Sequence, residues 1–373
     1  MIYFDNAATT KPYEAALKAF NNTALSTFGN SSSLHKFGLK SELEIQDAEK
    51  NILKRLSHDC SFPKEGKLIF TSGATESNNM AIRGVAELMH RKGKKIITTK
   101  TEHASVSNVM DSLISQGFDI LKVNPYDNNV EQQIADLTDK DTILISAIAV
   151  NNETGFKIDT KKLFSLVKEK NKDTIIHIDA VQAFCKLPVY GDLISISAHK
   201  IHGIKGVGGL FIQKGIKLPP LILGGEHQNG LRAGTLPTEL ITAFSSAACE
   251  YPYDNSHIVS LRKYFEEKIS EFDNIVINSK NSIPDIINFS ILNIKSEIML
   301  HYLEQHNIFV SGGSACSKGR RSNTLLGCGL PNKAIDSALR VSFSHQNTFE
   351  EIDQFFKILS KGIERFSKLK VKG

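Results

Sequence analysis

Between residues 65 and 225, short β-rich runs alternate with helical stretches. Two of the stretches between them, "TESNNMAIRGVAELMHRKG" and "TKKLFSLVKEK", are predicted to be helices. This alternation is typical of crossover units on a mostly parallel sheet, so the predicted fold class is α/β. A ligand is then expected at the carboxyl ends of the strands. The seven predicted strands are "KLIFTSG", "KKIITTK", "FDILKVN", "DTILISAIAV", "TIIHIDA", "LISISAH" and "GVGGLFIQ".

The alternation stops at residues 249–257, "CEYPYDNSH", where proline and polar residues indicate a domain boundary. A chain of 373 residues is too long for one ordinary core, which favours a large domain with a smaller one. We predict a large α/β domain over residues 15–250. Residues 1–14 and 251–373 are predicted to form a smaller α+β domain, which ends in an amphipathic helix, "TFEEIDQFFKILSKGIERF".

Composition excludes several classes of protein. No stretch approaches the roughly 20 apolar residues of a membrane-spanning helix, and the amino terminus lacks a basic start followed by an apolar block, so a cytoplasmic location is expected. A net charge of +5 without a dense basic block argues against direct binding of nucleic acid. Five scattered cysteines without a CxxC argue against disulfides and a structural metal site. We therefore expect no bound metal.

Polar residues gather where the predicted strands end. "FTSGATESNN" opens a helix at Ala74 and Thr75, where free backbone N–H groups favour an anion such as phosphate; a simple N-capped helix is the alternative. A buried carboxylate at Asp179 needs a cationic or hydrogen-bonding partner. The other polar residues at this edge are Asn151, Asn152, His103, Gln182, Ser197, His199 and Lys200.

A lysine, an acid, an imidazole and an anion-binding turn at one edge of a sheet are the parts that pyridoxal 5'-phosphate requires. Lys200 would carry this cofactor as an imine, and the glycines after it allow close approach of the backbone. A nucleotide-binding P-loop is excluded because "GIKGVGG" does not match GxxxxGK[ST].

Ten motifs in order resemble the cysteine desulfurases of the NifS/IscS type, which are fold-type I pyridoxal phosphate enzymes of aminotransferase class V. The resemblance runs from residue 3 to about residue 345. The motifs are "YFDNAATT", "GNSSSLHKFG", "FTSGATESNN", "TEHAS", "VNNETG", "HIDAVQ", "SAHK", "GLRAGT", "SACSKG" and "ALRVSFS".

The resemblance implies a role for each residue around the cofactor. Lys200 would be the imine lysine, and His103 would stack on the pyridine ring and move protons. Asp179 would hold the ring nitrogen and Gln182 the ring hydroxyl. The residues implied to bind the phosphate are Ala74, Thr75, Ser197, His199 and, from the partner chain of a homodimer, Thr235.

The resemblance also implies the substrate-binding residues. Asn152 would lie beside cofactor and substrate, and Arg340 would hold the substrate carboxylate in a bidentate ion pair, helped by Asn30. Three positions depart from the family pattern. Ser31 stands where proline is usual, which predicts a looser turn, and Gln228 with Asn229 replaces a charged pair close to Arg232.

Cys316 is the candidate nucleophile, since Lys318, Arg320 and Arg321 in "SGGSACSKGRRSN" lower the cost of a thiolate. Cys185 and Cys249 are expected to be buried and inert.

The implied function is a cysteine desulfurase that converts L-cysteine to L-alanine. Its sulfur would wait on Cys316 as a persulfide for an acceptor protein in iron–sulfur cluster assembly or in tRNA or cofactor thiolation. A selenocysteine lyase or a class V aminotransferase on the same cofactor is an alternative, and a non-enzymatic binding paralogue is another.

Overall fold

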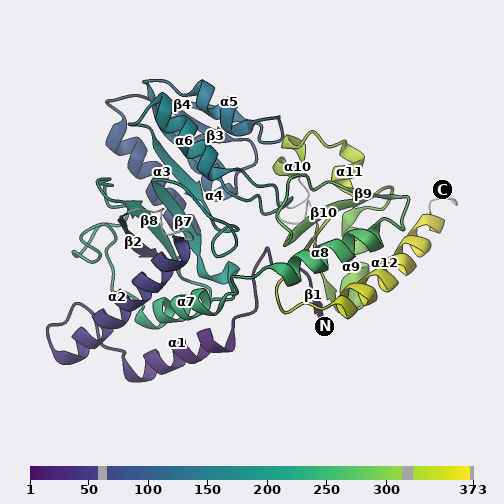
Figure 1. Cartoon of the computed structure of the whole chain (residues 1–373), viewed down its shortest axis with the longest axis horizontal. Helices are drawn as coiled ribbons and strands as arrows, with labels where there is room; N and C mark the ends of the chain where they lie inside the picture. Colours follow the sequence, from purple (N-terminus) through teal and green to yellow (C-terminus); the bar gives the residue numbers. More distant parts are fainter. Residues whose placement is uncertain (58–64, 313–321, 370–373) are drawn as a thin grey trace. The chain divides into compact units, whose positions relative to one another are not determined.

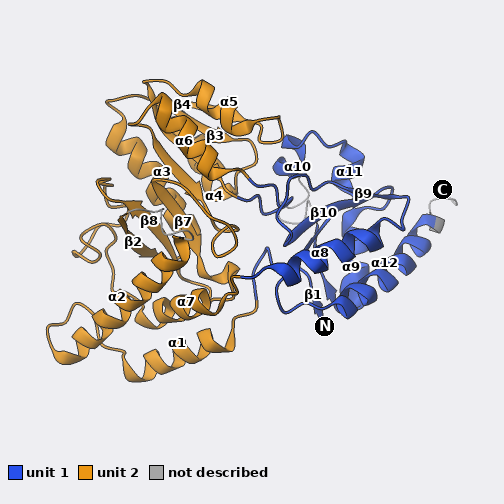
Figure 2. Cartoon of the chain, viewed as in Figure 1, with its two compact units in different colours: residues 1–10, 150–157, 254–373 blue, residues 11–149, 158–253 orange. Residues whose placement is uncertain are grey.

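The computed structural model describes residues 1–57, 65–312 and 322–369 (Figure 1). The chain divides into two compact units, which Figure 2 shows in different colours. Unit 1 comprises Met1–Thr10, Val150–Lys157 and Asp254–Gly373, and unit 2 comprises Lys11–Ala149 and Ile158–Tyr253.

The division differs from the predicted one chiefly at Val150–Lys157, which the sequence places in the large domain and the structure places in unit 1. Backbone and side-chain hydrogen bonds explain the difference. The Ile283 amide donates to Gly155 O at 2.9 Å, and the Ser279 hydroxyl donates to Thr154 O at 2.6 Å. The outer boundaries lie at residues 10 and 254 rather than at 14 and 251.

Unit 2 contains a seven-stranded sheet in the order β2-β8-β7-β6-β5-β3-β4. Every neighbouring pair is parallel except the two that involve β8, which runs antiparallel to β2 and β7. The predicted mostly parallel sheet is confirmed. The strands are β2 (Gly66–Thr71), β3 (Lys95–Thr99), β4 (Asp119–Val123), β5 (Thr142–Ile148), β6 (Ile175–Asp179), β7 (Leu193–Ser197) and β8 (Gly208–Gln213).

The three central strands β5, β6 and β7 are buried along their whole length, which is why they read as nearly unbroken apolar runs. Their carboxyl ends lie together, because Ile148 pairs with Asp179 and Asp179 pairs with Ser195. Polar residues that end these strands therefore meet at one edge of the sheet.

Some helices of unit 2 pack on the sheet, and others pack on one another. α3 packs on the sheet through Met80, Ile82 and Val85. α1 and α2 lie against α7, where Thr23 and Thr242 share a hydroxyl hydrogen bond of 3.0 Å. The helices are α1 (Glu14–Ser26), α2 (Lys36–Leu56), α3 (Ala74–Met89), α4 (Ala104–Ile114), α5 (Val130–Leu137), α6 (Thr160–Lys170) and α7 (Thr238–Glu250), with the short 3-10 helix η1 (Ala198–Lys200).

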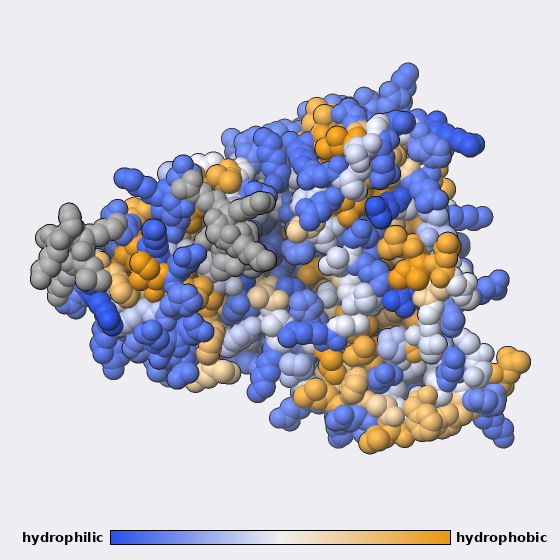
Figure 3. Space-filling view, turned by 180° about the vertical axis from the view of Figure 1, so that it is seen from behind, coloured by the Kyte–Doolittle hydropathy of each residue, from blue (hydrophilic) through white to orange (hydrophobic). Residues whose placement is uncertain are grey.

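Large apolar side chains are exposed around α1 and α2. Leu25, Phe28 and Leu34 are 81%, 72% and 104% exposed. Figure 3 shows hydrophobic surface gathered over this part of unit 2, at the lower right of the view. A group of this kind is typical of a surface that another protein covers.

Unit 1 is the predicted α+β layer. Its four-stranded antiparallel sheet has the order β12-β13-β10-β9, and β1 pairs with β11 in parallel. The strands are β1 (Ile2–Tyr3), β9 (Ile275–Ile277), β10 (Ile286–Ile291), β11 (Ile308–Phe309), β12 (Ser311–Gly312) and β13 (Ala338–Ser342). The helices are α8 (Ser256–Ile269), α9 (Ser296–Gln305), α10 (Asn323–Gly327), α11 (Asn332–Asp336) and α12 (Phe349–Leu369).

Aromatic rings fill the core of unit 1. Phe265 of α8 lies 5.9 Å from Phe289 of β10 and 4.8 Å from Phe356 of α12, measured between ring centroids. These contacts join both helices to the sheet, and rings at such distances contribute more than their buried area alone. Across the described helices, none has the length and apolarity to cross a membrane.

Candidate active site

Asp179 ends β6 and is 2% exposed. Its Oδ1 accepts a hydrogen bond from the Val181 amide at 3.1 Å, and its Oδ2 accepts one from Asn78 Nδ2 at 2.8 Å. Burial raises the pKa of Asp179, whereas these two donors and the nearby charges of His103 and Lys200 act to lower it. The carboxylate is thus held in a dry position with an imidazole and an amine as its electrostatic neighbours.

His103 is the N-cap residue of α4. Its Nδ1 accepts a hydrogen bond from the Ser105 amide at 3.1 Å and lies 2.8 Å from Ser105 Oγ. Ser105 Oγ also accepts from Asn78 Nδ2 at 2.8 Å. Asn78 therefore contacts both Asp179 and the residue that holds His103.

Ser197, His199 and Lys200 follow one another at the end of β7 and in η1. Ser197 is buried, and His199 and Lys200 are half-buried. Burial, together with the nearby amines of Lys200 and Lys205, lowers the pKa of His199 to about 4. The imidazole of His199 is therefore neutral near pH 7, so it offers a neutral N–H donor rather than a charge.

The first turn of α3 is built to receive an anion. Helix N-terminal N–H groups have no acceptor within the helix, and the helix dipole favours negative charge there. The only acidic residue of this turn, Glu76, is ion-paired with Arg232 at 2.9 Å. This pair neutralises the charge that would repel a phosphate.

Gln228, which departs from the family pattern, makes two hydrogen bonds to the backbone of Phe70. Its Oε1 accepts from the Phe70 amide at 2.6 Å, and its Nε2 donates to Phe70 O at 2.9 Å. Since β2 is an edge strand, the side chain supplies the pairing that a further strand would give. The segment that carries Arg232 is therefore anchored despite the replacement of the charged pair.

Arg340 is a buried residue of β13 in unit 1. Its Nη2 donates to Asp5 Oδ1 at 2.6 Å and to Ser311 Oγ at 2.9 Å, and its Nη1 donates to Asn152 O at 2.8 Å. The Nε atom is buried and has no hydrogen-bond partner among the described residues. The structure therefore brings Arg340 and Asn152 together, and both terminal nitrogens of the guanidinium donate to protein groups.

The remaining predicted site residues differ in how exposed they are. Gln182 is buried in the turn after β6, whereas Asn30 and Thr235 are exposed. In the turn at Ser31, Ser32 N donates to Asn30 Oδ1 at 2.9 Å and Ser33 N donates to Asn30 O at 3.0 Å. An asparagine side chain thus closes this turn, and its looseness relative to a turn with proline stays a prediction.

The cysteines are of different kinds. Burial raises the pKa of Cys185 to about 12, as expected for an inert thiol. Cys249 is exposed, so its expected burial is wrong; it lies in the last turn of α7, where apolar neighbours in the sequence turn to the opposite face. Cys316, with Lys318, Arg320 and Arg321, lies outside the described residues.

Three buried residues at this edge were missed by sequence reasoning. Glu102 Oε1 accepts from Thr99 Oγ1 at 2.6 Å and from the Ile148 amide at 3.0 Å, so it joins the end of β3 to the end of β5. Asn78 and Ser105 each offered one signal, namely a polar residue among the buried positions of a helix. That signal does not say which distant residue the polar group contacts.

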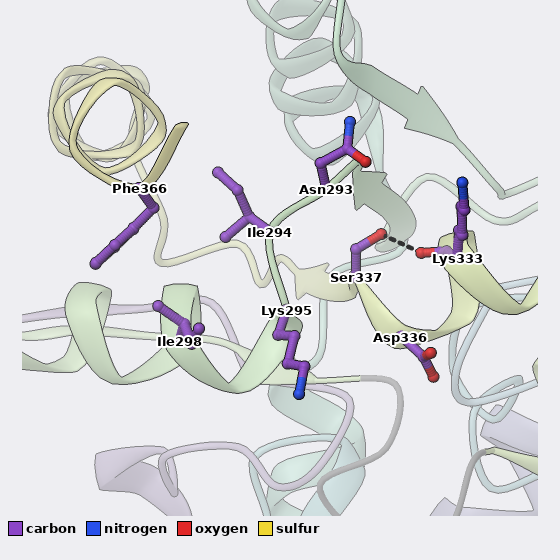
Figure 4. Close-up of a pocket in the computed structure, with 8 residues that line it drawn as sticks. All are labelled: Asn293, Ile294, Lys295, Ile298, Lys333, Asp336, Ser337 and Phe366. Atoms are coloured by element: carbon purple, nitrogen blue, oxygen red, sulfur yellow. Dashed lines mark hydrogen bonds between the residues drawn. The ribbon is translucent and has the colours of Figure 1, made fainter. Parts of the chain in front are cut away.

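A pocket of about 380 Å³ is present in unit 1 (Figure 4). Its apolar wall comes from Ile294, Ile298 and Phe366. Figure 4 shows Lys295, Lys333 and Asp336 around it, with the Ser337 hydroxyl bonded to Lys333 O at 2.8 Å. None of the residues predicted for catalysis lines this pocket.

The residues of unit 2 fit pyridoxal phosphate. A helix N-terminus whose acidic side chain is neutralised suits the phosphate, and a buried carboxylate that keeps two hydrogen-bond donors suits a protonated ring nitrogen. Lys200 supplies an amine that interacts electrostatically with this carboxylate. The sheet and this set of groups define a pyridoxal phosphate enzyme of fold type I.

Comparisons with known proteins agree with this assignment to the pyridoxal phosphate enzymes. The Aminotransferase class-V family profile matches residues 2–355, so the chain belongs to this family of pyridoxal-phosphate-dependent enzymes. Cysteine desulfurase IscS of Buchnera aphidicola subsp. Baizongia pistaciae is 37% identical, over 99% of this chain and 94% of that protein.

Two solved structures extend the comparison. One titled "NIFS-LIKE PROTEIN" has a TM-score of 0.87 and 31% identity, and covers 98% of this chain and 99% of its own. Another, titled "SspA in complex with cysteine", has a TM-score of 0.80 and 30% identity, and covers 92% of this chain and 99% of its own.

Proposed function

We propose that this chain is a cysteine desulfurase that takes sulfur from L-cysteine and leaves L-alanine. The observation that carries the proposal is the placement of buried Asp179 with His103 and Lys200 as electrostatic neighbours, at the sheet edge where α3 begins. Whole-length similarity to a protein named cysteine desulfurase, and to a structure titled as a complex with cysteine, supports the choice of substrate.

Unit 2 would hold the cofactor through residues that the structure describes. The N-terminus of α3 at Ala74 and Thr75 would bind the phosphate, together with Ser197 and His199. Asp179 would keep a proton on the ring nitrogen, and Gln182 would contact the ring hydroxyl. When bound, pyridoxal phosphate supplies an aldehyde that condenses with amines and a ring that withdraws electrons from the substrate.

The protein's own groups would then carry the proton and sulfur transfers. The Lys200 amine would remove the proton from the substrate α-carbon, and His103 would serve as a further proton-transfer group. Arg340, with Asn152 and Asn30, would hold the substrate carboxylate.

Cys316 would complete the reaction as the nucleophile. Its thiolate attacks the substrate sulfur, a sulfur–sulfur bond forms and the carbon–sulfur bond breaks. The electron pair of the broken bond stays on the β-carbon, which takes up a proton, so L-alanine leaves and a persulfide remains. No external oxidant is needed, because sulfur is oxidised as carbon is reduced.

The experiment is to incubate the purified holoenzyme with L-cysteine and to measure alanine and the mass of the Cys316 peptide. We expect alanine and a gain of one sulfur atom on that peptide. Cys316→Ala should lower alanine formation at least ~100-fold, because the attacking atom is lost. Cys328→Ala serves as the matched control and should leave both readouts unchanged.

Two results would contradict the proposal. Full turnover by Cys316→Ala would indicate an aminotransferase, which does not need this thiol. A preparation that takes up pyridoxal phosphate but forms no alanine from L-cysteine, and is active on L-selenocysteine, would indicate a selenocysteine lyase.

The partners follow from the same proposal. The chain would act as a homodimer, in which Thr235 of one chain completes the phosphate site of the other. The sulfur would pass to an acceptor protein for iron–sulfur cluster assembly or for thiolation, in the cytoplasm. The exposed apolar side chains around α1 and α2 support a surface for association.

A further inference from the structure

We propose that Asn78 and Ser105 are positioning residues that join Asp179 to His103 and keep the ring proton of neutral His103 on Nε2. Three contacts of 2.8 Å form the connection: Asn78 Nδ2 to Asp179 Oδ2, Asn78 Nδ2 to Ser105 Oγ, and Ser105 Oγ to His103 Nδ1. The inference deepens the proposed function, since it concerns residues of the same site.

The tautomer of His103 follows from the Ser105 amide. This backbone N–H donates to His103 Nδ1 at 3.1 Å, so Nδ1 must offer a lone pair. In a neutral imidazole one nitrogen is a donor and the other an acceptor. A proton on Nδ1 would face the amide proton directly, and the ring proton therefore resides on Nε2.

The donor and the acceptor can be assigned for each hydrogen bond between Asp179 and His103. An ionised Asp179 accepts only, so Asn78 must present its Nδ2 to it. The second hydrogen of the same amide nitrogen goes to Ser105 Oγ. Because Ser105 Oγ accepts this bond, its own hydrogen is available to His103 Nδ1, which then receives donors from both the backbone and the side chain of Ser105.

The connection also responds to the charge on Asp179. Asn78 Oδ1 is buried and has no hydrogen-bond partner in the described part of the chain. If Asp179 became neutral, rotation of the amide would bring Oδ1 toward the Asp179 proton and the Ser105 hydroxyl. His103 would then lose one of its two donors, so the charge on Asp179 and the tautomer of His103 are coupled.

The lone pair of His103 is engaged at Nδ1 by α4, and the free edge of the ring carries an N–H group. His103 therefore presents a donor to the bound molecules, so that its part in proton transfer is to give a proton at Nε2, and removal of the substrate α-proton is left to Lys200.

The test measures the tautomer in the apoenzyme. The protein is labelled with 15N-histidine, and two-bond 15N–1H spectra are recorded at alkaline pH, where the rings are neutral. The chain has 12 histidines, so the His103 signals are assigned by their loss in His103→Gln. We expect wild type to show one tautomer, with the proton on Nε2.

Variants then probe the two positioning residues. Asn78→Ala and Ser105→Ala should each raise the share of the Nδ1–H tautomer roughly fivefold, the factor that one neutral hydrogen bond carries. Ser105→Thr keeps the hydroxyl and should restore the wild-type spectrum. Ser112→Ala is the matched control, because its hydroxyl lies on the same helix but donates to Val109 O.

The outcomes separate this inference from the proposed function. A wild-type proton on Nδ1, or a Ser105→Ala spectrum identical to wild type, would overturn the inference even in an active desulfurase. Should Asn78→Ala fail to fold, the pair Ser105→Ala and Ser105→Thr decides alone. A chain that shows the expected tautomers but releases no alanine would instead refute the proposed activity.

Discussion

Glu102 is a buried carboxyl group next to His103 in sequence. Its Oε1 accepts two hydrogen bonds, whereas its Oε2 is buried without a hydrogen-bond partner in the described residues. Burial raises the pKa of Glu102 to about 8, although the donors from Thr99 and Ile148 oppose the rise. The group is therefore neutral near pH 7, because an ionised form would leave a dry, half-satisfied charge.

The raised pKa of Glu102 predicts a stability that falls with rising pH. The unfolded chain releases this proton near pH 4.5, while the folded chain keeps it up to about pH 8. Between these values the unfolded state binds fewer protons, so the free energy of unfolding should fall by up to roughly 5 kcal/mol. Glu102→Gln should flatten this slope, as urea unfolding across the range would show.

The control for this experiment is Glu87→Gln, which changes an exposed carboxyl group on α3. It should leave the pH dependence of unfolding as in wild type. An unchanged slope in Glu102→Gln would show that Glu102 is ionised in the folded protein.

At the scale of elements, the close approach of β8 to the start of α3 shapes the anion site. A Cβ atom on Gly208 would lie 2.7 Å from Ile196 O and 2.8 Å from Gly73 Cα. Both neighbours are backbone atoms, which cannot move aside as a flexible side chain would. The glycine thus allows β8 to lie directly against the turn that opens α3.

Gly208→Ala is expected to displace that turn. The substitution should lower stability by about 1–3 kcal/mol, as overpacking does, and weaken binding of pyridoxal phosphate about tenfold. Binding of pyridoxal, which lacks the phosphate, should change far less. Fluorescence titration of the apoenzyme with both compounds measures the difference.

Gly84→Ala on α3 is the matched control. The nearest atom to its added Cβ is the end of the Leu218 side chain at 3.3 Å, which can shift. Equal weakening of pyridoxal phosphate and pyridoxal by Gly208→Ala would contradict a role for this contact at the phosphate.

At the scale of the whole molecule, the exposed apolar side chains around α1 and α2 require an explanation. Leu25, Phe28 and Leu34 together present more apolar surface than scattered single residues usually do. The proposed homodimer would cover this surface, and Thr235 on an exposed segment of unit 2 would reach the partner's phosphate site.

Sedimentation equilibrium should therefore give the mass of two chains for wild type. The double substitution of Phe28 and Leu34 by glutamate should yield a folded monomer. A dimer of this variant would have to bury the new carboxylates in its apolar interface, which is costly. That monomer should bind pyridoxal phosphate more weakly, since Thr235 of the partner is absent. Leu88→Glu, an exposed position on α3, is the control and should remain dimeric. A wild-type monomer that binds the cofactor tightly would refute this arrangement.

Much of unit 2 could be predicted from local patterns. The central strands β5, β6 and β7 lie where apolar runs occur, since strands covered on both faces show no polar alternation. Asp179 and Lys200 were recognisable because each ends such a run, and the carboxyl ends of parallel strands share one edge.

Contacts between distant segments could not be predicted in this way. Asn78 is 27 residues from Ser105 and 101 from Asp179. Arg340 lies 335 residues from Asp5. Hydrophobic periodicity reports whether a side chain is buried, and many partners are compatible with the same periodicity.

The α/β class, the smaller α+β layer and the polar residues at the sheet edge are all readable from the order of residues, because burial and strand direction leave a local pattern. The assignment of Val150–Lys157 to unit 1, the ion pair of Glu76 with Arg232 and the contacts of Asn78 with Asp179 and Ser105 became visible in the folded chain alone. These depend on how packed elements orient individual hydrogen-bonding atoms, which is settled by the whole fold rather than by any short stretch of chain.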